Sequence, residues 1–520
     1  MKTSSSSKKE NQPSALAGNR GRPAEIKRRG MLGVLGSSGL ALVAGFDPVA
    51  RLWVRQVEAA SCPSFVDAPP LDGALLLDAA SREAVAKDKG NIAHETPCAV
   101  LRPGSVQDIS KMILYCRRHR IKVAARGQGH TTFGQSLSGG LVIENQSLAT
   151  IHSIGPDGAD VDAGVRWKDL LIASFAQGLT PPVLTGYTAL SVGGTLSVGG
   201  ISGRYNSGAQ VDHIRELEVV TGAGQIRRCS MRQNRDLFEA VLAGLGQCAV
   251  ITRARVDLIP AKPMARLYNP TYTDNATFFR DMRTLLRRGE LNECFNICFP
   301  APGGTGFVYQ IQAVSYFNPS NPPDNARLMR GLSVPAAAVP FRDMSYLDWE
   351  LNVDVLIDFF RATFGWDALI KPWFDVWLPG RAAERYAGEV IPSLTPRDVG
   401  PLGFLLLFPL RRSKLTRPFF RLPDGGADDD DGGFVYLFDI LTASAAPGPD
   451  PGFVSDMLAR NRRLFEKARA VGGTRYPIGA LNFSRYDWQR QYGELWEEFA
   501  ERKRRFDPDN ILTPGPGIFP

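Results

Sequence analysis

The chain has 520 residues, of which 44% are hydrophobic and 22% charged, with 52 glycines and 37 prolines. This length predicts two to four domains of roughly 150 residues each, and the composition excludes a coiled coil, a disordered chain and a small disulfide scaffold. The formal net charge is +8, yet residues 1–60 alone hold ten Lys and Arg against four Asp and Glu. Because the positive charge is concentrated at one end, we expect no nucleic-acid partner.

The first sixty residues have the layout of an export signal with paired arginines. A polar start leads to Arg28 and Arg29, a mildly apolar stretch runs from Met31 to Phe46, and small residues stand at positions 59–61. The apolar stretch contains several Gly and Ser and is shorter than the roughly 20 residues of a bilayer span. We therefore predict a twin-arginine-type signal, a periplasmic or secreted protein and no permanent membrane span. A membrane anchor and a basic cytoplasmic tail are the alternatives.

The cysteine, histidine and aspartate patterns predict no bound metal. The seven cysteines are odd in number and contain no CxxC pair, so neither a disulfide framework nor a zinc site is predicted. Cys294 and Cys298 could share a helix face, but their apolar neighbours favour plain burial. The five histidines form no ligand motif. Four consecutive aspartates within Gly425–Gly433 indicate a solvated loop, with calcium binding as the weaker alternative.

Short apolar strands alternate with helical stretches and glycine turns between Val100 and Pro260, which is typical of an α+β block. Apolar residues at three- and four-residue spacing predict a helix over Val106–His119. The predicted strands of this block include Ile121–Ala125, Gly140–Ile143 and Leu217–Gly222.

A longer mixed block follows Pro260 and extends to about residue 470. It contains a short candidate for a buried strand at Gly403–Leu410. The last fifty residues contain a predicted helix over Trp488–Arg505 and then a tail rich in Pro and Gly.

Two glycine-rich stretches carry the strongest functional signal. In Arg126–Ser136, glycines flank polar residues between two predicted strands, and such a turn lets backbone N–H groups approach a pyrophosphate. No GxGxxG opens a long helix there, which disfavours a Rossmann nucleotide site. The repeated glycines of Leu190–Gly203 suit a backbone lying flat against a large planar ligand. Ordinary Gly-Gly hairpin turns are the alternative for this second stretch.

Together these stretches resemble the flavoproteins of the vanillyl-alcohol oxidase superfamily, and most closely the cytokinin dehydrogenases. The resemblance depends on five motifs: Arg126–His130, Ser191–Ser197, Gly200–Gly203, Gly244–Arg255 and Phe506–Phe519. It implies an α+β fold in which residues 90–262 and the return at residues 470–520 form a two-part FAD-binding domain. Residues 263–469 would then form an inserted α+β substrate, or cap, domain, and residues 1–60 the export signal.

The resemblance also implies the residues that hold FAD. His130 matches the histidine that carries the flavin through a covalent bond to its 8α carbon. Relatives with a second covalent link have a cysteine in the segment matching Leu190–Gly203, and this segment has none. A single tether is therefore implied. The implied FAD-binding residues are His130, Arg126, Gly127, Gln128, Gly129, Thr131, Gln135, Ser136, Ser191, Gly193, Gly194, Thr195, Ser197, Ile201, Ile251 and Thr513.

The chemistry implied is hydride transfer from a small organic donor, an amine or an alcohol, to flavin N5, with electrons passing to oxygen or another acceptor. The family places a catalytic aspartate at the position of Gly186, so the expected base is missing. Leu332–Pro340 has no carboxylate where the family places a second acidic contact, and Val198 replaces a family asparagine.

Three residues are candidates to replace the missing aspartate: Tyr187, Asp375 and Asn482. We predict Tyr187 as the catalytic residue because it lies beside the vacancy. Because the chain departs from the family pattern, we expect an oxidase of some other amine or alcohol, and two alternatives to that function remain. One is a true cytokinin dehydrogenase that cleaves N6-isoprenoid adenines, and the other is a non-catalytic flavin-binding protein. A binding protein without flavin is disfavoured by the motif around His130.

Overall fold

The computed structural model describes residues 42–47, 52–56, 62–63, 65–302, 306–424 and 433–519. The chain divides into two compact units, residues 1–61 and residues 62–520. In the first unit, strands β1 (Leu42–Asp47) and β2 (Leu52–Gln56) pair as an antiparallel hairpin. Arg28 and Arg29 of the predicted export signal lie outside the described residues, and so do the four consecutive aspartates. Those two interpretations stay predictions.

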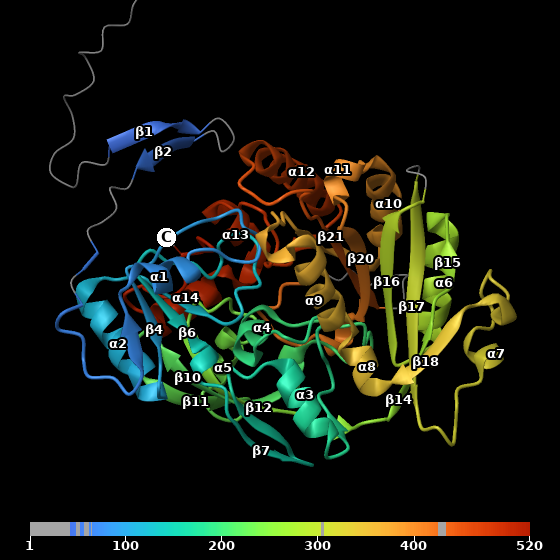
Figure 1. Ribbon diagram of the computed structural model, residues 1–520, viewed down its shortest axis with the longest axis horizontal. Coiled ribbons are helices and arrows are strands. Elements are labelled where there is room, and N and C mark those ends of the chain that lie inside the picture. The colour runs from blue at the N-terminus through green and yellow to red at the C-terminus, as the bar shows by residue number, and fades with distance from the viewer. Residues whose placement is uncertain are drawn as a thin grey trace, which may run out of the picture. The chain divides into compact units, whose positions relative to one another are not determined.

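The second unit begins with a four-stranded sheet packed against helix α2 (Val106–His119) (Figure 1). The α2 N–H of Asp108 donates to the hydroxyl of Ser105, which caps the helix at its start. Apolar α2 side chains, among them Ile109 and Met112, are buried against the sheet. This confirms the predicted helix. The strands, in spatial order, are β3 (Ala74–Leu76), β4 (Ala99–Arg102), β6 (Leu141–Glu144) and β5 (Val123–Arg126).

An antiparallel sheet of five strands forms the second layer. Three helices accompany this sheet: α3 (Trp167–Phe175), α4 (Val192–Val198) and α5 (Arg235–Val241). Helix α4 occupies Val192–Val198 of the second glycine-rich stretch, so that part of the stretch is not a hairpin turn. In spatial order the strands are β11 (Ile226–Ser230), β10 (Ile214–Thr221), β12 (Ala249–Val256), β8 (Gly158–Asp162) and β7 (Ile151–Gly155).

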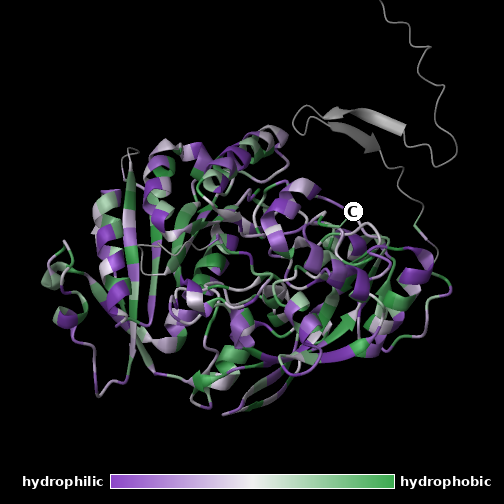
Figure 2. Ribbon diagram, turned by 180° about the vertical axis from the view of Figure 1, so that it is seen from behind, coloured by the Kyte–Doolittle hydropathy of each residue, from purple (hydrophilic) through white to green (hydrophobic). Residues whose placement is uncertain are grey.

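A sheet of nine strands dominates the later part of the chain. Figure 2 shows hydrophobic and hydrophilic residues mixed along its strands. Helices α6 (Asn275–Arg288), α10 (Gly380–Val390) and α12 (Pro451–Ala470) pack against it. Its spatial order is β18 (Phe341–Ser345), β14 (Met264–Tyr268), β17 (Phe307–Phe317), β16 (Glu293–Pro300), β20 (Phe404–Arg411), β21 (Phe434–Leu441), β19 (Phe374–Pro379) and β22 (Thr474–Arg475), with β15 (Thr271–Tyr272) on β17.

Strand β20 confirms the predicted strand at 403–410 and shows how the large sheet uses its two faces. Leu405 and Leu407 are buried, whereas Phe404, Leu406 and Phe408 line a cavity on the opposite face. Side chains alternate across a strand, so one face joins the core and the other is left to contact a ligand. Cys294 and Cys298 are both buried as predicted, but they lie on strand β16 and not on a helix.

The C-terminal segment is hydrogen-bonded to the first sheet. The Thr513 N–H donates to the Val123 carbonyl at 2.7 Å, and the Val123 N–H donates to the Ile511 carbonyl at 2.8 Å. The predicted single helix over 488–505 is wrong. It is divided into α13 (Arg485–Tyr492), a 3₁₀ turn and α14 (Trp496–Phe506), because Gly493 adopts a positive φ of 54° and ends α13.

Shorter elements complete the described part of the chain. Strands β9 (Leu179–Thr180) and β13 (Ile259–Pro260) form a two-stranded ribbon. The remaining helices are α1 (Ala79–Ala84), α7 (Asn325–Leu328), α8 (Tyr346–Glu350), α9 (Asn352–Phe364) and α11 (Pro396–Val399). None of the described helices is long and apolar enough to cross a membrane.

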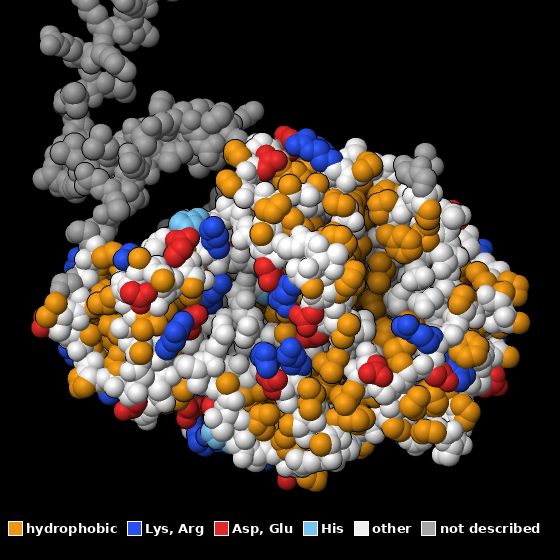
Figure 3. Space-filling model, viewed as in Figure 1, with side chains coloured by type: hydrophobic (Ala, Val, Ile, Leu, Met, Phe, Trp, Pro, Cys, Tyr) orange, Lys and Arg blue, Asp and Glu red, His pale blue; other side chains and the backbone are white. Residues whose placement is uncertain are grey.

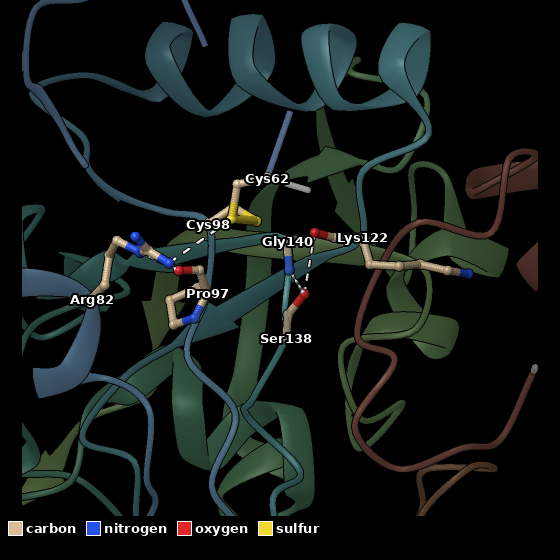
Figure 4. Close-up of a disulfide and its surroundings, with 7 residues drawn as sticks. All are labelled: Cys62, Arg82, Pro97, Cys98, Lys122, Ser138 and Gly140. Atoms are coloured by element: carbon tan, nitrogen blue, oxygen red, sulfur yellow. Dashed lines mark hydrogen bonds between the residues drawn. A yellow bond between two sulfur atoms is a disulfide. The ribbon is translucent and has the colours of Figure 1, made fainter. Parts of the chain in front are cut away.

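A disulfide joins Cys62 to Cys98, which the cysteine count did not predict (Figure 4). Cys98 is followed directly by β4, so the bond holds the start of the second unit to its first sheet. The Arg82 side chain lies alongside, and its Nε donates to the Pro97 carbonyl at 2.6 Å. The odd count concealed this pair because the other five cysteines are buried and unpaired.

Candidate functional site

A cavity of about 550 Å³ lies inside the second unit, between the two smaller sheets and the open face of the large sheet. A hollow with a largely hydrophobic visible wall opens beside α9 in the space-filling view (Figure 3), and α9 contributes Val353, Leu356 and Ile357 to the cavity wall. Asn482, a candidate from the sequence, does not line the cavity. All sixteen residues predicted to bind FAD line it, and so do Gly186, Tyr187, Val198 and Asp375.

The first glycine-rich stretch turns tightly over Asp88. The Asp88 carboxylate accepts hydrogen bonds from the Gly134 N–H at 2.6 Å and from the Thr131 hydroxyl at 3.0 Å. Gly129 has a φ of 60°, and a Cβ added at Gly127 would overlap the Ser191 hydroxyl. Both glycines are therefore required by the backbone geometry, which brings the two glycine-rich stretches into contact.

The site has the features of a cradle for a bound group. The Ser191 hydroxyl is buried and has no hydrogen-bond partner among the described residues, although it lines the cavity. Gly193 and Gly194 also line the cavity, and because they have no side chains the backbone itself forms the wall there. A buried hydroxyl without a partner is unfavourable unless a ligand supplies one, so this wall suits a polar ligand pressed against the backbone.

Several predicted FAD-binding side chains also have structural partners. The Gln135 amide donates to the carbonyls of Ile478 and Gly479, both at 3.1 Å, and so joins the glycine turn to a distant loop. The Thr195 hydroxyl accepts from the Trp167 indole at 2.7 Å, and the Thr513 hydroxyl donates to the Gly246 carbonyl at 2.9 Å. These side chains shape the cavity wall even before they contact any ligand.

His130 lies among aromatic and positively charged side chains. Its ring is stacked on Tyr187 and meets Trp373 edge-on, with both ring-centroid distances at 5.3 Å. Burial, followed by the positive charges of Lys89, Lys371 and Arg361, lowers the pKa of His130 to about 3. The imidazole is therefore neutral at physiological pH and keeps a nitrogen lone pair available for bonding.

There is free space around Gly186, which stands where the family has its catalytic aspartate. A Cβ built on Gly186 meets nothing closer than Val353 Cγ2, at 3.9 Å, so the wall there has room for a side chain or for part of a ligand. Tyr187, our catalytic candidate, stacks on His130, and its hydroxyl accepts a hydrogen bond from Arg361 at 3.1 Å. Burial raises the pKa of Tyr187, which makes it a poor proton acceptor at neutral pH. Its geometry indicates positioning of His130.

Carboxylates from other elements line the cavity, and sequence reasoning missed most of them. Asp375 on β19 was a candidate, but Asp439 on β21, Glu293 on β16 and Glu350 on α8 were not recognised. The available signal for Asp439 was a lone charge inside the apolar run Phe434–Leu441. Residues 332–340 do not line the cavity, so no acid from that segment could reach it.

Comparisons with known proteins agree with this geometry. Residues 97–230 match an FAD binding domain family, and residues 292–519 match the family described as cytokinin dehydrogenase 1, FAD and cytokinin binding. Cytokinin dehydrogenase 2 of Arabidopsis thaliana is 31% identical over 490 residues, which cover 87% of this chain and 95% of that protein. The chain belongs to the cytokinin dehydrogenase family of FAD-dependent oxidoreductases.

Other members of the family show similar coverage. Cytokinin dehydrogenase 3 of Oryza sativa subsp. japonica is 33% identical over 479 residues, covering 83% of this chain and 89% of that protein. An uncharacterized oxidoreductase, ORF5 of the fasciation locus in Rhodococcoides fascians, is 35% identical over 432 residues, covering 82% of this chain and 95% of that protein. The FAD-binding part and the second, cytokinin-binding part fit the two-domain arrangement of the vanillyl-alcohol oxidase flavoproteins.

FAD fits the cavity that this family member presents. The glycine turn over Asp88, the unpartnered Ser191 hydroxyl and the side-chain-free wall at Gly193 together suit a pyrophosphate and a flat ring system. The apolar face of the large sheet supplies the opposite wall through residues such as Phe404 and Leu406. The boundaries predicted at residues 90, 262 and 470 stay predictions.

Proposed function

We propose that this oxidoreductase oxidises a small amine or alcohol and is a weak cytokinin dehydrogenase. The observation that carries the proposal is the open wall at Gly186, where the chain offers no base and leaves space for a different donor. When bound, FAD would supply the hydride acceptor and the route for electrons to oxygen or another acceptor. The apolar wall formed by Trp373, Tyr187 and the aliphatic side chains of α9 would exclude water and orient the donor.

We also propose that His130 carries FAD covalently. The neutral imidazole, held between Tyr187 and Trp373, has the lone pair that bond formation at the 8α carbon needs. In this arrangement Tyr187 and Trp373 fix the ring plane. Nearby positive charge from Lys89 and Lys371 would favour negative charge building up on a bound flavin.

The test is a visible spectrum of the purified protein before and after acid precipitation, followed by a donor screen. We expect a yellow protein, acid-stable flavin and oxygen-linked turnover of donors such as benzylamine or benzyl alcohol. Brisk oxidation of isopentenyladenine would instead favour a true cytokinin dehydrogenase. The match of residues 292–519 to the cytokinin-binding family supports that alternative. A yellow protein that no donor reduces would favour a non-catalytic flavin-binding role.

Export by a twin-arginine route is our proposal for localisation. The Cys62–Cys98 disulfide supports it, since such bonds persist in oxidising compartments and are rare in the cytosol. FAD is made in the cytoplasm and would be enclosed by a folded domain before export. A route for folded cargo, marked by Arg28 and Arg29, meets that requirement.

A further inference from the structure

Asp375 and Asp439 form a buried carboxyl pair in the cavity wall. Strands β19 and β21 are antiparallel neighbours in the large sheet, and their register places these two residues directly opposite each other. Both side chains line the cavity, yet the residues are only 3% and 4% exposed. Apart from the carboxyl that each offers the other, neither oxygen of Asp375 has a hydrogen-bond partner among the described residues, and Oδ1 of Asp439 also lacks one.

The pair lies near the His130 turn. Trp373, two residues before Asp375, meets the His130 ring edge-on. Asp375 also packs against Gly479, because a Cβ added at Gly479 would overlap its Oδ2. The Gly479 carbonyl in turn accepts from Gln135 of the glycine turn at 3.1 Å. The carboxyl pair is thus attached to the same part of the cavity wall that holds the proposed flavin tether.

Burial keeps the pair from carrying two charges. It raises the pKa of Asp375 to about 7 and holds the pKa of Asp439 well above its usual range, since adjacent buried carboxyls cannot both ionise. Interaction with Asp439 and the positive charge of Arg475 favour ionisation of Asp375. Tyr476, whose pKa is also raised by burial, is the other titratable side chain facing the pair. Asp439 therefore keeps its proton, and Asp375 is the member of the pair that ionises as the pH rises through about 7.

Two other acids that line the cavity, Glu350 and Glu293, already have hydrogen-bond partners within the protein. Glu350 accepts from Arg204 at 2.8 Å, and Glu293 accepts from the Tyr316 hydroxyl. Arg204 itself is buried between these two glutamates. Both glutamates therefore have partners within the protein, whereas Asp375 has, in the described part of the chain, only the carboxyl of Asp439 as a hydrogen-bond partner and faces the cavity.

We propose that Asp375, paired with the protonated Asp439, accepts the N–H or O–H proton of the donor in place of a side chain at position 186. The donor N–H or O–H bond breaks and an O–H bond forms on Asp375. The adjacent C–H bond gives its hydride to FAD, and a C=N or C=O double bond forms in the product. The single negative charge of the pair selects amines and alcohols and disfavours carboxylate donors. This inference rests on the proposed function.

Infrared spectroscopy and pH-dependent kinetics test the pair on the complete FAD-loaded protein. We expect the wild type at pH 7 to show the carbonyl stretching band of a protonated carboxylic acid. The band should lose the contribution of Asp439 in Asp439→Asn, whereas Glu293→Gln, at the other acid whose pKa is raised to about 7, should leave that contribution in place. Asp375→Asn should lower kcat/KM for benzylamine or benzyl alcohol by 10²–10⁴-fold and remove the acid limb of its pH profile. The exposed carboxylate variant Asp169→Asn serves as the control, with unchanged activity.

The outcomes separate this inference from the proposed function. Absence of a protonated-carboxyl band in the wild type, or its loss only in Glu293→Gln, would overturn the pair whatever the protein oxidises. If no donor is turned over, the proposed function fails while the infrared result still decides the protonation of the pair. An unchanged pH profile in Asp375→Asn, with a donor that the wild type oxidises, would overturn the proton-acceptor role.

Discussion

Replacing Gly186 with aspartate tests why this chain should differ from the cytokinin dehydrogenases it resembles. The backbone at Gly186 is not in the left-handed region, and an added Cβ meets Val353 Cγ2 only at 3.9 Å. The side chain should therefore fit without displacing the wall. Asparagine has nearly the same shape and no basic oxygen, which makes Gly186→Asn the matched control.

The size of the effect follows from the chemistry of one positioned base. A general base typically contributes 10²–10⁴-fold to the rate, which corresponds to about 3–5 kcal/mol of transition-state free energy. The wild type should oxidise isopentenyladenine poorly, because Gly186 supplies no proton acceptor where the family aspartate stands and the proposed acceptor, Asp375, belongs to a different element, β19. Gly186→Asp should raise kcat/KM for this donor by about 10²-fold or more over Gly186→Asn. The same change should lower activity toward bulkier donors, because it fills the space beside Val353.

Steady-state oxygen consumption with isopentenyladenine measures this directly. Flavin content and the melting temperature should be equal in the two variants, so that a rate difference reports the carboxylate alone. Wild-type turnover at ordinary enzyme rates of about 1–10³ s⁻¹ would refute the reasoning, because it would show that the base at position 186 is dispensable. Equal rates for the aspartate and asparagine variants would refute it too.

Four further predictions follow from the structure. His130→Ala should lose acid-stable flavin, which acid precipitation followed by a visible spectrum detects; retained acid-stable flavin would disprove the tether. Arg28→Lys with Arg29→Lys should trap the protein in the cytoplasm, and cell fractionation showing unchanged export would remove the twin-arginine proposal. Cys98→Ser opens a bond that closes a separation of 36 residues, so it should lower the free energy of unfolding by about 4 kcal/mol in denaturant titration; an unchanged midpoint would contradict this. Asp439→Asn should change the pH dependence of stability: the folded pair keeps protons that the unfolded chain releases near pH 4, so the contribution of the pair to the free energy of unfolding falls as pH rises from about 4 to about 7. The difference in free energy of unfolding between wild type and Asp439→Asn should fall over this range in denaturant titrations, and a constant difference would contradict the raised pKa values.

Local patterns predicted the elements whose stability depends on their own residues. Helix α2 was predictable because its apolar residues recur on one face and Ser105 caps its start. The two helices after Ser484 were harder to predict from sequence, because helix-forming residues surround Gly493. The positive φ of Gly493 ends α13 before α14 begins. The Cys62–Cys98 bond was hidden for a different reason: nothing in the spacing tells which two of seven cysteines the fold brings together.

The sequence by itself determined the cofactor side of the site. The glycines at 127, 129, 193 and 194 and the histidine at 130 belong to short motifs whose resemblance to the flavoprotein family predicts a flavin cradle, and all five positions line the cavity. The donor side was decided only by the tertiary structure. Asp375 and Asp439 are 64 positions apart and become neighbours only through the register of β19 and β21. Their shared proton depends on burial, and burial is a property of the assembled sheet that no short stretch of sequence contains.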